Sequence, residues 1–137
     1  MRRLIFVLAI AACGHPPKHD HGTPAPTHED DPTCPVLVAG TSVTVEDTAQ
    51  GAALVFVTTG DAKAVQQRAT AFAAQHQAGA TGFAGMVETP STATASPIDH
   101  GARVELTATT ADGAGALQSE LRMHVEHLAN GTCKMAM

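Results

Sequence analysis

The sequence predicts an α+β fold in which two ββα repeats form a four-stranded antiparallel sheet with two helices packed on one face. Two segments with strand alternation are followed by one segment with helical periodicity, and the same order recurs about fifty residues later. One hairpin with one helix cannot bury its apolar face alone. We therefore expect the two units to fold together as one domain.

The chain divides into three regions, of which the third forms that domain. Residues 1–12 begin with Arg2 and Arg3 and continue as an apolar run that ends on small residues. This layout is typical of a cleaved secretory signal, and the run is too short to span a bilayer as a permanent helix. Residues 13–33 are predicted to be a tether, and residues 34–137 the single folded domain.

Residues 10–13, IAAC, resemble the lipobox of bacterial lipoproteins. The resemblance implies cleavage before Cys13 and a diacylglycerol on its sulfur. Two or more acyl chains would make the membrane attachment stable. The other interpretation is an ordinary cleaved signal peptide with a spare cysteine.

The tether is rich in proline and polar residues and lacks any large apolar side chain, so it is not expected to fold by itself. It contains four histidines beside several acidic residues: His15, His19, His21 and His28. Such tracts bind divalent metals in some proteins, whereas in others they are only polar spacers. Both interpretations stay open.

The first repeat starts with predicted strands at residues 42–46 and 53–58, joined by a turn in which Asp47 and Gly51 lie. Asp61 is predicted to cap the helix that follows. Apolar side chains and one histidine then recur on one helical face: Val65, Ala69, Phe72, Ala73 and His76.

The second repeat matches the first at a shift of fifty, with residues 102–106 aligned on residues 52–56. Asp99 takes the place of a turn residue, Asp112 that of a helix cap, and Gly101 that of Gly51. Both glycines are expected to need a positive φ in their turns. The second helix repeats the apolar face with five residues: Leu117, Leu121, His124, Val125 and Leu128.

The second hairpin alternates clearly, with Val104 and Leu106 on one side and Arg103 and Glu105 on the other. This pattern predicts a sheet with one face exposed to water. The more apolar segment 54–57 leaves a second interpretation open, in which the sheet face contacts a protein partner or a second copy.

Composition excludes several classes of function. The formal charge is −5, and loss of the signal removes two further positive charges, which argues against a nucleic-acid partner. The chain has no Trp or Tyr, so stacking platforms for bases or sugars are not expected. It contains no GxSxG or HExxH motif, and we predict that it is not an enzyme.

Two cysteines, Cys34 and Cys133, lie at the ends of the predicted domain. In an oxidising compartment outside the inner membrane they are expected to form a disulfide. The competing interpretation makes both thiols metal ligands.

The second helix contains the main candidate metal ligands: Met123, His124 and His127. His76, at the end of the first helix, is a weaker candidate. Imidazole and thioether groups favour copper, especially Cu(I), although other divalent metals also bind imidazole. In the competing interpretation His124 is a packing residue, because it aligns with Phe72, and His127 is only solvated.

The lipobox, the Pro/His tether, the segment GTSVTVEDTAQGAALVFVTTGD and the segment GARVELTA followed by a His/Met helix resemble small uncharacterised lipoproteins of high-GC Gram-negative bacteria. The resemblance implies a cell-envelope location and a duplicated domain, and it implies no reaction. Gly14 after the lipid-bearing Cys13 indicates the outer membrane by analogy with lipoprotein sorting in other bacteria.

The resulting hypothesis is a lipid-anchored, non-catalytic cell-envelope protein that binds a soft or borderline metal ion. The alternative is a structural envelope lipoprotein that acts through protein–protein contacts without a metal.

Overall fold

The computed structural model describes residues 31–79, 83–130 and 133. The predicted signal peptide, the lipidated Cys13 and most of the tether lie outside these residues. The same holds for the four tether histidines: His15, His19, His21 and His28.

The described elements follow the order predicted by the repeat. They are η2 (Pro35–Leu37), β1 (Thr41–Thr48), β2 (Gly51–Thr58), α1 (Ala62–Gln77), η3 (Phe83–Gly85), β3 (Ser91–Ile98), β4 (Gly101–Ala108) and α2 (Gly113–Leu128). The α+β fold of two ββα repeats is therefore confirmed, and β1 and β2 are longer than their sequence patterns indicated.

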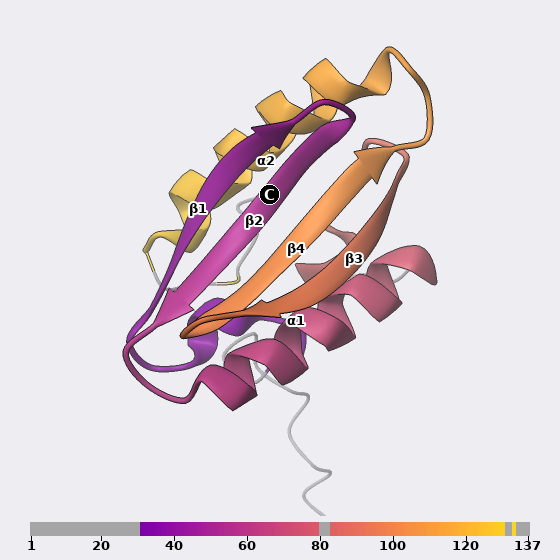
Figure 1. Cartoon of the computed structure of the whole chain (residues 1–137). Helices are drawn as coiled ribbons and strands as arrows, with labels where there is room; N and C mark the ends of the chain where they lie inside the picture. The colour runs from indigo at the N-terminus through magenta and orange to yellow at the C-terminus, as the bar shows by residue number, and fades with distance from the viewer. Residues whose placement is uncertain (1–30, 80–82, 131–132, 134–137) are drawn as a thin grey trace, which may run out of the picture.

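The four strands form one antiparallel sheet in the order β1-β2-β4-β3. Figure 1 shows this sheet with both helices on the same side of it. Helix α1 packs mainly on β3 and β4, whereas α2 packs mainly on β2 and β1. Each helix thus covers mainly the hairpin of the other repeat, and neither repeat can bury its core without its counterpart.

The two central strands pair symmetrically. Leu54 lies opposite Val104, while Gly51 lies opposite Thr107 and Gly101 opposite Val57. The inward side chains of this pair meet the apolar faces of both helices. The largest fully buried side chains of the sheet and helices are Leu54, Phe56, Val65, Phe72, Val104, Leu106, Leu117 and Leu121.

The hairpin turns differ from the prediction. Only two residues separate the strands in each hairpin, so Asp47 lies within β1, whereas Asp99 is in a turn as expected. The positive φ of the second hairpin belongs to His100, at 59°. Gly51 and Gly101 are instead the first residues of β2 and β4, and the prediction that they need a positive φ was wrong.

These two glycines are required for a different reason, which is the close approach of the central strands. A Cβ atom on Gly51 would overlap the carbonyl oxygen of Leu106 and approach Leu117 Cδ2 to 2.8 Å. A Cβ atom on Gly101 would overlap the carbonyl oxygen of Phe56. A side chain at either position would force the two strands apart.

The helix caps are unequal. The Asp61 carboxylate accepts a hydrogen bond from the Ala64 backbone amide at 3.1 Å, as predicted. Asp112 occupies the N-cap position of α2, but its side chain makes no capping hydrogen bond. The sequence pattern therefore did not distinguish Asp61, whose side chain caps its helix, from Asp112, whose side chain does not.

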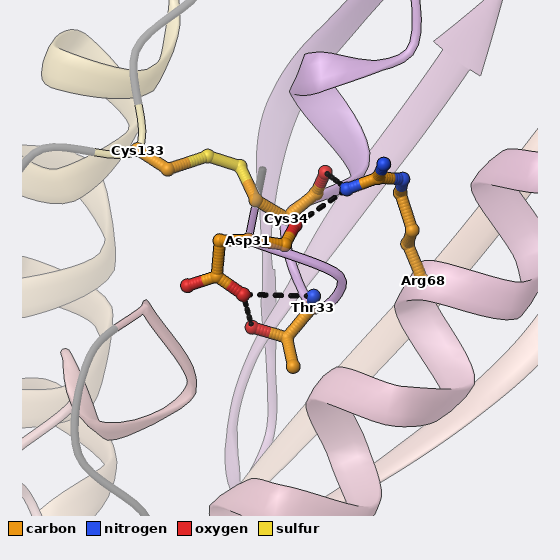
Figure 2. Close-up of a disulfide and its surroundings, with 5 residues drawn as sticks. All are labelled: Asp31, Thr33, Cys34, Arg68 and Cys133. Carbon is orange, nitrogen blue, oxygen red and sulfur yellow. Dashed lines mark hydrogen bonds between the residues drawn. A yellow bond between two sulfur atoms is a disulfide. The ribbon is translucent and has the colours of Figure 1, made fainter. Parts of the chain in front are cut away.

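Cys34 and Cys133 form a disulfide that joins the start of the domain to the residues after α2, with their Cα atoms 6.3 Å apart (Figure 2). The bond closes a loop of 99 residues, for which the chain-entropy model gives about 4 to 5 kcal/mol of stabilisation. Nearby, Arg68 donates hydrogen bonds to the carbonyl oxygens of Asp31 and Cys34. The segment before β1 is thus attached to α1 through Arg68 and to Cys133 through the disulfide.

Replacement of Gly101 by Val should lower the free energy of unfolding by at least about 3 kcal/mol, the upper end of the range for overpacking, because the new side chain meets backbone atoms that cannot move aside. Urea denaturation measures this. Gly115→Ala is the control: its Cβ meets nothing within 4 Å, so it should gain about 0.5 to 1 kcal/mol. Equal midpoints for Gly101→Val and the wild type would contradict the close approach of the strands.

Candidate functional site

A pocket of about 420 Å³ lies between α2 and the segment that leads into β3. It is the place where the described residues gather soft donor atoms. Its lining consists of Met86, Glu88, Thr89, Glu120, Met123 and His124.

Glu120 joins the two walls of this pocket. Its carboxylate accepts hydrogen bonds from the backbone amides of Glu88 and Thr89, the second at 3.0 Å. The same carboxylate lies 3.6 Å from Nε2 of His124, one helical turn further along α2. Its side chain is only 13% exposed, so water screens these interactions weakly.

The surroundings of Glu120 shift its ionisation. Burial raises the pKa of a carboxyl group, but hydrogen bonds from Thr89 and Glu88 and the nearby His124 lower it by more. The pKa of Glu120 therefore lies below its usual value. The carboxylate is charged at neutral pH and holds the segment 88–89 against the helix.

Two thioethers and one imidazole line the pocket around Glu120. Met86 is 3% exposed, whereas Met123 is 59% exposed on the outer surface of α2. The side chain of His124 is 14% exposed, between these extremes. A ligand in the pocket would meet a buried sulfur, a surface sulfur and an imidazole.

The predicted ligands are thus brought together only in part. Met123 and His124 share the pocket, but His127 is exposed and is not part of its lining. Cys133 is bonded to Cys34, so neither sulfur is a free thiolate ligand. Among the described residues, no group of three or more His, Cys, Asp or Glu side chains is placed to hold a metal ion.

His76 lies in a separate set of contacts. Its Nδ1 is 3.1 Å from the carbonyl oxygen of Ala84, and its Nε2 is 3.0 Å from the hydroxyl of Ser91. Its ring also stacks on Phe72, with the ring centroids 6.0 Å apart. Both ring nitrogens are occupied, so His76 holds the connecting segment to α1 and does not offer a free donor.

Four residues of the pocket were absent from the predicted ligand set: Met86, Glu88, Thr89 and Glu120. The i, i+4 spacing of Glu120 and His124 could have placed them on one helical face. Nothing in the sequence indicates that Met86 approaches α2, because the connecting segment has no periodic pattern. Only the tertiary structure shows this proximity.

Glu120→Gln should lower the free energy of unfolding by about 1 to 3 kcal/mol at pH 7, because it weakens the charge-assisted hydrogen bonds to the backbone. The folded pKa is lowered, so this stabilisation is present above the unfolded value of about 4.3 and is lost as the pH falls through the folded value. The difference from wild type should therefore disappear in strong acid. Urea denaturation at pH 7 and at successively lower pH measures it.

Glu126→Gln, an exposed position on the same helix, is the control for Glu120→Gln and should change stability by less than about 0.5 kcal/mol. A loss for Glu120→Gln that stayed constant across this pH range would contradict the assigned role of the carboxylate.

Comparison with known proteins adds no relative. No protein-family model, no curated protein sequence and no solved structure matches the chain. Within the part of the chain that the structure describes, no helix is both long and apolar enough to cross a membrane.

Proposed function

We propose that this protein is a lipid-anchored, non-catalytic component of the cell envelope, held at the outer membrane through Cys13, and that it binds Cu(I). The location follows from the signal, the lipobox and the resemblance to small envelope lipoproteins. The proposal of Cu(I) binding depends on one observation: Met86, Met123 and His124 line the same pocket.

The ligand types favour a soft monovalent ion. Thioether sulfur and imidazole nitrogen are neutral donors that prefer Cu(I), and hard divalent ions prefer carboxylates and water. The one carboxylate well buried beside the pocket, that of Glu120, already accepts two backbone hydrogen bonds. It is therefore better suited to support the site than to bind the ion directly.

Burial and exposure divide the roles of the two methionines. Met86 is covered by the protein and would supply an already ordered sulfur atom. Met123 projects from the surface, where its flexible side chain can close over an ion that has entered. His124 is intermediate in exposure and presents an imidazole beside the Glu120 carboxylate, an arrangement that often orients metal-binding histidines.

Titration with Cu(I) against a chromophoric chelator tests this proposal. The protein should be the full chain carrying Cys13→Ser, which has no thiol for acylation. His124→Phe copies the residue found in the first repeat and should weaken Cu(I) binding at least about tenfold, as should Met123→Leu, because each removes one donor atom.

Glu88→Gln is the matched control, because it changes a hard donor at the same pocket and leaves the soft donors intact. Its Cu(I) affinity should stay within about twofold of wild type. Every variant and the reference protein should also carry Gln in place of the four tether histidines, so that the titration reports on the pocket. Wild-type affinity in both His124→Phe and Met123→Leu would exclude the pocket as the copper site.

A second candidate function is a structural lipoprotein that acts through protein contacts on the open sheet face. The observation that favours it is Val57, which is 43% exposed at the end of a central strand, beside the half-buried Val55. Arg103 forms ion pairs with Glu46 and Glu105 on the same face. This combination of apolar centre and charged surroundings is typical of contact surfaces.

Chemical cross-linking in intact cells tests this alternative. One partner should be recovered with and without added copper, and Val57→Lys should abolish its recovery because a charge would then replace the exposed apolar side chain. Ser119→Lys, on the exposed side of α2, should leave recovery unchanged. Recovery that persisted in Val57→Lys would exclude the sheet face.

A further inference from the structure

A second hollow of about 430 Å³ lies between α1 and the edge strand β3. Ala95, Pro97 and Ala102 contribute apolar atoms to it. Lys63 and Gln67 border it from the helix, and their aliphatic stems add to the apolar surface. This volume is within the range of small-molecule binding sites.

The internal repeat supplies a comparison for this groove within the same molecule. Gln66 of α1 donates a hydrogen bond to the carbonyl of Gly101 at 3.1 Å, and Gln118 of α2 donates one to the carbonyl of Gly51 at 3.0 Å. The two helices therefore sit equivalently on their strands. Each residue that borders the groove has a structural counterpart between α2 and β1.

The floor of the groove differs from its counterpart in side-chain size. Ala95 of β3 lies opposite Val104 of β4. In the other hairpin, Val45 of β1 takes the equivalent position opposite Leu54 of β2. Val45 packs against the core with a side chain that has two more carbon atoms than that of alanine. The smaller side chain leaves the space between α1 and β3 unfilled.

The opening of the groove differs as well. On the α2 side, Arg122 forms an ion pair with Asp47 that spans from helix to strand. On the α1 side the equivalent residues are Thr70 and Pro97, which cannot form such a pair. The counterpart is thus bridged by an ion pair, while the groove beside β3 is left open.

The charge at the groove is positive. Lys63 is exposed at its border, and none of the ion pairs among the described residues includes it. The ammonium group of Lys63 beside an apolar floor is complementary to a carboxylate with an alkyl chain.

We propose that this groove binds an acidic amphiphile of the fatty-acid class. The carboxylate pairs with Lys63, and the alkyl chain lies on Ala95, Ala102 and Pro97. This site is separate from the copper pocket and does not depend on it, because the two share no lining residue.

Titration with decanoate below its critical micelle concentration, followed by amide NMR signals, tests the proposal on the full chain carrying Cys13→Ser. Decanoate should shift the signals of Ala95 and Ala102. Ala95→Val, which copies Val45, should weaken binding at least about tenfold by filling the floor. Thr70→Glu, at an exposed helix position in the same lining, should weaken it in the same direction without any change in the core, because a carboxylate there would repel decanoate.

Lys63→Gln should weaken decanoate binding about three- to fivefold, the size of a partly exposed ion pair. Decyltrimethylammonium has a similar alkyl chain but a permanent positive charge. It should therefore bind the wild type more weakly than decanoate does. Val45→Ala is the control for Ala95→Val, since it shortens the equivalent side chain away from the groove and should leave decanoate affinity unchanged.

Three results would overturn the proposal: no shift at Ala95 and Ala102, unchanged affinity in both Ala95→Val and Thr70→Glu, or equal binding of decyltrimethylammonium. Copper titration of Ala95→Val separates the two sites, because its Cu(I) affinity should equal that of wild type whatever the outcome with decanoate.

Discussion

The pairing of β2 with β4 is the contact on which the rest of the domain depends. These strands join the two repeats, and they approach so closely at Gly51 and Gly101 that no side chain fits there. The symmetric register places Leu54 against Val104 at the centre of the inward face. Because each helix then covers mainly the hairpin of the other repeat, a shift of this pair would expose both helical faces at once.

Secondary connections hold the less regular segments to this framework. The disulfide and Arg68 attach the segment before β1 to the end of the chain and to α1. Glu120 performs the corresponding task before β3, where it accepts from backbone amides, whereas Arg68 donates to backbone carbonyls. Equivalent helix positions thus use opposite charges, since one entry segment presents acceptors and the other presents donors.

The two repeats have the same backbone arrangement but differ in the side chains that border it. In α2, His124 and Met123 face the segment before β3 and create a pocket with soft donors. Beside α1, Ala95 and Pro97 leave a groove that the other repeat bridges with an ion pair. A duplicated fold allows such divergence, because a change in one copy leaves the shared central strand pair intact.

The sequence alone determined the order of the elements, the duplication and the face of each helix, because periods of two and of about 3.6 residues report directly on burial. It also indicated Asp61 as a cap, since capping is local chemistry. It did not indicate the true role of Gly51 and Gly101, because close approach of two strands depends on a partner about fifty residues away.

Only the tertiary structure decided which candidate ligands meet. Met123 and His124 are neighbours in sequence, but Met86 joins them because a connecting segment without periodicity folds against α2. His76 aligned well with the apolar face of its helix, yet its ring nitrogens are taken by Ala84 and Ser91. Periodicity specifies the face on which a side chain lies, whereas the partner on that face is set by long-range packing.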